Sequence, residues 1–97
     1  MPTYIVLASF TEQGIANVKD TPKRADAAKA AAKKAGATLK EIYWTLGQHD
    51  IVAIFEAPDD ETMTAIGLII GKAGNVRTQT LRAFSAADMK TILGKVG

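Results

Sequence analysis

The segment from Gly47 to Pro58 constrains this fold more than any other, because it joins a tight turn directly to a strand. Gly47-Gln48-His49-Asp50 has the composition of a turn, with a glycine that can take a positive φ. An apolar strand, Ile51 to Ala57, follows the turn, and another, Leu39 to Leu46, precedes it. A link this short predicts that the two strands form an antiparallel hairpin.

Two further strands and three main helices are predicted around this hairpin. The strands are rich in β-branched and aromatic residues and cover Thr3–Phe10 and Val76–Phe84. The helices are expected over Pro22–Ala35, Asp60–Ala73 and the segment after Ser85, with Thr21, Asp59 and Ser85 as their caps. A short helix capped by Thr11 is expected before the first of them, over Glu12–Val18. The order β-α-β-β-α-β-α predicts an α+β protein, a ferredoxin-like βαββαβ fold with an antiparallel sheet and a C-terminal helix, as a single domain over residues 1–97.

The strands are apolar on both faces, which predicts that both faces of the sheet are covered. In the first strand, Tyr4, Val6, Ala8 and Phe10 point one way, and Thr3, Ile5, Leu7 and Ser9 point the other. In the second, Ile42, Trp44 and Leu46 are expected on one face, and Leu39, Glu41, Tyr43 and Thr45 on the other. Helices are expected over one face only, where the stripe Ala25, Ala28, Ala32 and Ala35 lets a helix lie close to the sheet. We therefore predict that a second copy covers the other face, as a face-to-face dimer or a closed two-chain barrel of the dimeric α+β barrel type.

Composition and charge limit the classes of partner that we expect this chain to bind. The net charge is only +2, and the basic residues on and around the first long helix have no interleaved aromatic residues, which predicts a solvated face: Lys23, Arg24, Lys29, Lys33, Lys34 and Lys40. No run of residues is long enough to span a bilayer, which takes about 20 apolar residues, and the N-terminus does not resemble a signal peptide. We therefore expect neither nucleic acid nor a membrane as a partner. The absence of cysteine favours a reducing, cytoplasmic setting.

Few residues carry the pattern of catalysis or metal binding. His49 and Asp50 can converge in the turn, and histidine transfers protons near neutral pH, but a plain surface turn, in which Asp50 bonds to neighbouring amides, is the favoured interpretation. One histidine and no cysteine give no transition-metal cluster, and the acidic residues from Glu56 to Glu61 fit helix capping. No catalytic residue, metal or cofactor is therefore predicted. Thr78, Thr80 and Arg82 share a strand face that suits an anion, and Tyr4, Tyr43 and Trp44 are candidates to line a pocket between two sheets.

Two stretches, GQHDIVAIFEAPDDETM and GNVRTQTLRAF, resemble the GYD domain family, which takes its name from a Gly-x-Tyr-Asp signature before a strand. The N-terminal third also resembles that family. His49 stands where the signature has tyrosine. The resemblance therefore assigns the signature's roles to Gly47 and Asp50 only. It implies a fold of the dimeric α+β barrel superfamily, similar to the effector domains of Lrp/AsnC-type regulators, which bind small effectors near this turn at subunit contacts.

Three hypotheses of function follow. The first is a homo-oligomer without enzymatic activity that binds a small-molecule effector at a subunit interface, with these ligand-binding candidates: Gly47, His49, Asp50, Tyr4, Tyr43, Thr78, Thr80 and Arg82. The second, implied by the superfamily, is a cofactor-free or haem-handling monooxygenase with its site between the sheets. The third is a purely structural assembly module.

Overall fold

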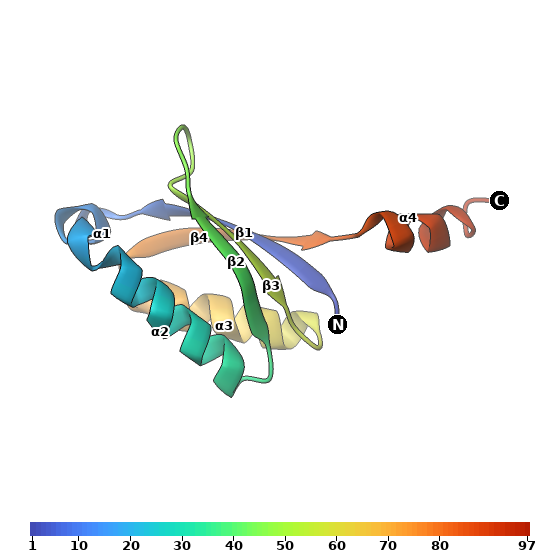
Figure 1. Cartoon of the computed structure of the whole chain (residues 1–97), viewed down its shortest axis with the longest axis horizontal. Coiled ribbons are helices and arrows are strands. Elements are labelled where there is room, and N and C mark those ends of the chain that lie inside the picture. The colour runs from blue at the N-terminus through green and yellow to red at the C-terminus, as the bar shows by residue number, and fades with distance from the viewer.

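The computed structural model describes all residues, 1–97, as one four-stranded sheet with helices on one side (Figure 1). The strands are β1 (Thr3–Phe10), β2 (Thr38–Trp44), β3 (Ile51–Glu56) and β4 (Val76–Ala83). The helices are α1 (Glu12–Ala16), the 3-10 turn η1 (Val18–Asp20), α2 (Thr21–Lys34), α3 (Asp60–Lys72) and α4 (Ala86–Leu93). None of the helices is both long and apolar enough to cross a membrane.

The sheet has the strand order β2-β3-β1-β4, and every neighbouring pair is antiparallel. This order confirms the ferredoxin-like βαββαβ prediction and the central hairpin of β2 and β3. Both long helices, α2 and α3, lie against the same face of the sheet (Figure 1). The opposite face carries no helix, so we call it the open face.

The core lies between the sheet and the two long helices. Phe55, Met63 and Ile66 are its largest fully buried side chains, and Tyr4 and Val6 pack into the same cluster. Burial of each large apolar side chain contributes about 1.5–3 kcal/mol to folding. The alternate residues of β1 and β3 therefore hold the helices on this face, while their neighbours in sequence point to the open face.

A β-bulge in β2 corrects the predicted faces of that strand. Leu39 pairs with Phe55, and Glu41 pairs with the next residue along, Ile54, so Lys40 has no partner in the register. The extra residue reverses the alternation after Leu39. Leu39 and Ile42 consequently both pack towards the core, whereas a regular strand would place them on opposite faces. The prediction for Leu46 was also wrong, because β2 ends before it and its side chain is fully exposed.

The start of α2 differs from the prediction that Thr21 caps it. Thr21 has helical dihedral angles and is the first residue of the helix, and the capping position belongs to Asp20, whose side chain makes no cap hydrogen bond. The turn η1 leads directly into the helix and leaves no extended residue to act as a cap. The Thr21 hydroxyl instead accepts a hydrogen bond from Trp44 Nε1 at 3.1 Å. The caps predicted at Thr11, Asp59 and Ser85 are confirmed, each by a side chain that accepts from the first turn of its helix.

Candidate functional site

The loop between β2 and β3 rises from the sheet on the side away from the long helices (Figure 1). Gly47 lies in it with φ +99°, a conformation that other residues rarely adopt, which confirms the predicted role of the glycine. The loop closes where the Thr45 amide donates to the Asp50 carbonyl at 2.8 Å and the Thr45 hydroxyl donates to the His49 carbonyl at 2.6 Å. These two bonds fix the base of the loop.

Asp50 fastens the loop to the central strand. Its amide donates to the Ala8 carbonyl at 2.8 Å, and its carboxylate accepts the Phe10 amide at 2.8 Å. A charged acceptor strengthens such a bond. Asp50 therefore holds the end of β1 in place, and this contact between residues 40 positions apart has no signature in the sequence.

His49 is half-buried in the same loop. Its Nδ1 atom is buried and has no hydrogen-bond partner within the chain. No carboxylate lies within ion-pair distance of the ring, since the chain's single ion pair joins Lys40 and Glu56. The structure thus provides no partner that would orient His49 as a catalytic base.

Two rows of apolar side chains cross the open face. In the first row, Ile5 lies between Ile54 on β3 and Leu81 on β4. In the second, Leu7 lies next to Val52 on β3. Leu81 is 40% exposed, and no helix packs over any of the five. The prediction that helices cover only one face of the sheet is confirmed, and the open face leaves apolar side chains in contact with water.

Polar side chains border these apolar rows on the β2 side, and we call them the polar rim. Tyr43 lies beside Val52, is 53% exposed, and its hydroxyl donates to the Glu41 carboxylate at 3.2 Å. The negative charge of Glu41 raises the pKa of the Tyr43 phenol. Lys40, the residue of the bulge, pairs with Glu56 at 3.1 Å. An apolar centre with a polar rim is the usual anatomy of a protein interface.

The other predicted ligand-binding residues lie on the helix-covered side of the sheet. Tyr4 is buried, and its hydroxyl donates to Asp60 at 2.5 Å. Burial, with the contribution of this carboxylate, raises the pKa of Tyr4 to about 12. Arg82 pairs with Tyr4 across the strands, its guanidinium donates to the Thr3 and Ala83 carbonyls, and it lies 4.5 Å from the Phe84 ring.

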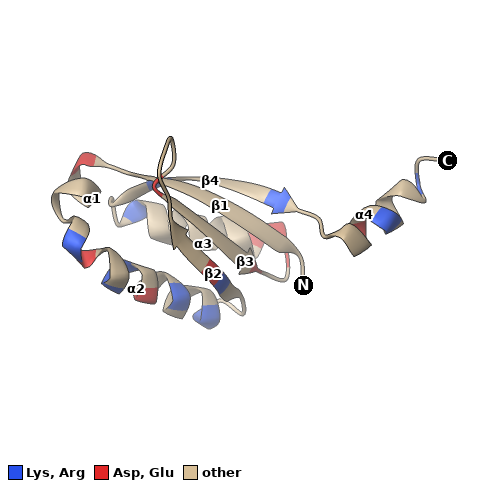
Figure 2. Cartoon of the chain, turned by 45° about the horizontal axis from the view of Figure 1, so that its top comes forward, with Lys and Arg blue, Asp and Glu red and all other residues tan.

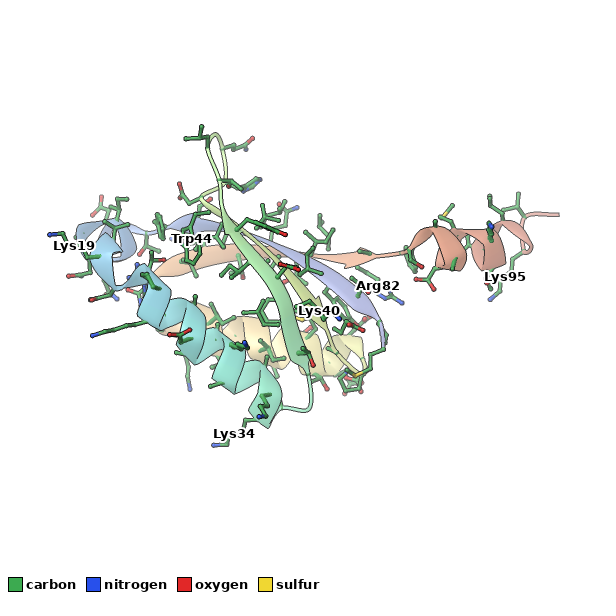
Figure 3. The ribbon with its side chains drawn as sticks, in the orientation of Figure 1. Lys19, Lys34, Lys40, Trp44, Arg82 and Lys95 are labelled. Carbon is green, nitrogen blue, oxygen red and sulfur yellow. The ribbon has the colours of Figure 1, made fainter.

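The predicted set is therefore divided between two faces. Gly47, His49 and Asp50 form the loop, and Tyr43 lies below it on the open face. Thr78 and Thr80 share the side of Tyr4 and Arg82, opposite Ala8 and Val6 of β1. Trp44 and Arg82 lie at opposite ends of the sheet (Figure 3). One protomer does not bring the whole set together, and binding by these residues stays a prediction.

More charged residues lie on the helices than on the strands. Lys and Arg residues follow α2, while β1 has no charged residue at all (Figure 2). The predicted solvated basic face needs one correction, since Arg24 is half-buried: its guanidinium donates to the Gly14 carbonyl at 3.1 Å and lies 5.9 Å from the Phe10 ring. No group of three or more histidine, cysteine, aspartate or glutamate side chains is placed to hold a metal ion.

The C-terminal helix α4 extends away from the body of the molecule (Figure 1). Ser85, the predicted cap, forms a capping box with Asp88 at its start, with both bonds at 3.0 Å. Its apolar side chains Met89 and Leu93 are exposed, as is Val96 just beyond its end. An isolated helix of eight residues is marginal in water, and in this protomer the apolar side chains of α4 remain in contact with water.

Comparison with known sequences decides the family. Residues 4–93 match the family model of the GYD domain. The chain belongs to the GYD domain family. A relative from Thermus thermophilus, the "Glutamine synthetase and cystathionine beta-lyase binding protein", is 32% identical over 90 residues, which are 92% of this GYD chain and 95% of the relative. The predicted resemblance is thereby confirmed over nearly the whole length.

Solved structures share the fold. The feast or famine regulatory protein of M. tuberculosis, solved with L-methionine, superposes with a TM-score of 0.68 at 14% identity, over 89% of this GYD chain and 52% of that regulator. The GYD chain thus spans about half of its length. A Thermus thermophilus protein of solved structure gives a TM-score of 0.56 at 26% identity, over 89% and 96% of the two chains. The first likeness confirms the predicted similarity to Lrp/AsnC effector domains as a similarity of fold.

Proposed function

We propose that this GYD chain is a self-associating binding domain without enzymatic activity, and that it takes a small molecule at a subunit interface beside the Gly47–Asp50 loop. The observation that carries the proposal is the uncovered pair of apolar rows on the open face. Burial of apolar surface drives most protein association. A second copy offers the same rows and the same polar rim, so two open faces are complementary to each other.

The loop and α4 support self-association in different ways. The loop rises on the open side, and a second protomer on that face would therefore lie against it and against Tyr43 (Figure 1). The helix α4 reaches beyond the body of its own chain with an exposed apolar stripe. Both features leave uncovered surface that contact with a second copy would bury.

In this proposal the ligand contacts Gly47, His49, Asp50 and Tyr43, which lie on the open side. The half-exposed imidazole of His49 offers it a hydrogen bond. Tyr4, Thr78, Thr80 and Arg82 lie on the opposite side of the sheet, and a ligand between two open faces does not reach them within the same protomer.

Sedimentation velocity at micromolar concentration tests the assembly. We expect at least a dimer of the 10.3 kDa chain, and we expect Leu81→Glu on the open face to convert it to monomer. Leu68→Glu is the matched control, because Leu68 is an exposed leucine on α3, away from that face, and this variant should stay oligomeric. A monomeric wild-type chain would refute the proposal.

Native mass spectrometry of the oligomer tests the ligand site. We expect a bound small molecule whose occupancy falls in His49→Ala and is retained in Leu68→Glu. Equal occupancy in His49→Ala would show that the molecule binds elsewhere.

The Thermus relative favours a second candidate function, that of a module that binds metabolic enzymes. Its name gives glutamine synthetase and cystathionine beta-lyase as its targets, and it aligns with 92% of this chain. Mixing the purified chain with each purified enzyme and measuring the mass of the complexes by light scattering tests this candidate. No complex at micromolar concentrations of both partners would exclude these two enzymes as targets.

A further inference from the structure

A cavity of about 260 Å³ lies between the long helices and the covered face of the sheet. Fifteen of its nineteen lining residues are hydrophobic. It is a different place from the proposed interface, because it lies on the opposite side of the sheet from the loop and Tyr43. Ile69 of α3, which is 44% exposed, belongs to its lining, so the cavity reaches the surface there.

The alanines of α2 account for this space. Ala25, Ala28 and Ala31 line the cavity and are only half-buried, whereas Ala32 is fully buried against the core. The alanine stripe thus brings the helix into close contact at Ala32 and leaves room along the preceding two turns. Interiors are normally filled to crystal density, so a space of this size next to a well-packed core calls for an occupant.

The polar residues of the lining gather at one end. Thr21 receives the indole hydrogen bond of Trp44, and Trp44 belongs to the cross-strand row that continues to Ala8 and then to Thr78. Asn75 lies at the same end, where its backbone carbonyl accepts a hydrogen bond from the backbone amide of Thr11, the residue after β1. The opposite end is closed by Leu39 and Phe55, which are both buried. The cavity is therefore apolar along its length and polar at one end.

Arg24 supplies the only charge in the lining. Its guanidinium donates one hydrogen bond, to the Gly14 carbonyl, and no carboxylate of the chain lies within 4.0 Å of it. A guanidinium has five N–H donors in a planar fork that matches a carboxylate. A half-buried cation with donors to spare at the polar end of an apolar cavity is suited to a single anionic group.

We infer that this cavity binds a small monocarboxylate with an apolar body, with the carboxylate on Arg24 and the apolar part along Ala28 and Ala31 towards Phe55. A cavity of 150 Å³ holds benzene, so about 260 Å³ suits a molecule of roughly ten non-hydrogen atoms. Medium-chain fatty acids and arylalkanoic acids belong to this class. Arg24 is the residue that selects the charge, and the alanines of α2 set the length.

Titration calorimetry of the full chain with octanoate tests the inference. We expect saturable binding at one site per chain. n-Octanol and acetate should each bind at least about tenfold more weakly, because n-octanol lacks the carboxylate and acetate lacks the apolar chain. Arg24→Gln should weaken octanoate about tenfold or more and leave octanol unchanged. Lys29→Gln is the matched control: it removes the same charge from an exposed position of the same helix and should bind octanoate like the wild type.

Filling the cavity gives an independent test. Ala28→Leu adds three carbons inside it and should abolish binding, and Ala31→Leu should do the same if the first variant does not fold. Ala30→Leu, at an exposed position of α2 outside the lining, should bind normally. Undiminished binding by both cavity-filling variants, equal affinity for octanoate and octanol, or no binding at millimolar octanoate would each overturn the inference. Leu81→Glu should leave octanoate binding intact, which separates this site from the proposed interface.

Discussion

The Tyr4 phenol gives the sharpest quantitative test of the structure. Tyr4 is 3% exposed in the core, and its hydroxyl donates to Asp60 at 2.5 Å. Burial disfavours the phenolate, and the neighbouring carboxylate disfavours it further, so the pKa rises from 10.0 to about 12. In the unfolded chain the same phenol titrates near its ordinary pKa of about 10.

The direction of the effect on stability follows from the order of these two pKa values. As the pH rises, the unfolded chain loses the Tyr4 proton first, and this ionisation favours unfolding. The stabilisation from the neutral phenol is therefore fully present well below pH 10, falls as the pH rises from about 10, and is lost above about pH 12. A shift of about two units corresponds to about 3 kcal/mol, at 1.36 kcal/mol for each unit.

Two variants isolate this effect, because the chain has only two tyrosines. In Tyr43→Phe, the phenolate absorbance reports Tyr4 alone, and we expect it to titrate at about pH 12 in the folded protein. The free energy of unfolding in urea is then compared between Tyr43→Phe and the double variant Tyr4→Phe/Tyr43→Phe. The difference between the two variants should fall by about 2 kcal/mol from pH 10 to pH 12, which is most of the full loss of about 3 kcal/mol, and the lysines that titrate in the same range cancel. A constant difference, or a Tyr4 titration near pH 10, would refute the buried phenol–carboxylate pair.

Two further substitutions test the loop and the tight contact beside α1 by urea denaturation. Asp50→Ala removes the charged acceptor of the Phe10 amide and should cost about 1.5–3 kcal/mol, whereas Asp50→Asn keeps an acceptor oxygen and should cost less; equal losses in the two variants would contradict this role. Gly14→Ala would bring the new methyl group to 1.9 Å from the Asn75 carbonyl and should cost at least about 1–3 kcal/mol. Gly67→Ala, in α3 with open space around it, should instead stabilise by about 0.5–1 kcal/mol, and a loss there comparable to that of Gly14→Ala would be unexpected.

The sequence predicted local structure well where the cause was local. The caps at Thr11, Asp59 and Ser85, the positive φ of Gly47 and the two apolar faces of β1 are each fixed by residues within a few positions. The bulge at Lys40 was missed because it depends on which residue of β3 pairs with Leu39. Nothing in the alternation of LKEIYW marks that register.

The residues of the candidate sites show the same division. The loop at Gly47–Asp50 was visible in the sequence, but the bond from the Phe10 amide to Asp50 and the one from Tyr4 to Asp60 join residues 40 and 56 positions apart. Arg24 was grouped with the solvated lysines by its charge, although it lies one helical turn before Ala28 of the alanine stripe. The structure shows its guanidinium at the Gly14 carbonyl and its side chain in the lining of the cavity.

The sequence by itself determined the order of the elements, the ferredoxin-like topology and the excess of apolar surface on the sheet. Hydrophobic periodicity and helix caps depend on residues that are close together in the sequence. The tertiary structure decided the rest. It placed Tyr43 and the loop on the open side, placed Tyr4, Thr78, Thr80 and Arg82 on the other, and left the alanine face of α2 above a cavity. These outcomes depend on strand register and on the distance between packed elements, which are set by long-range contacts that no short segment encodes.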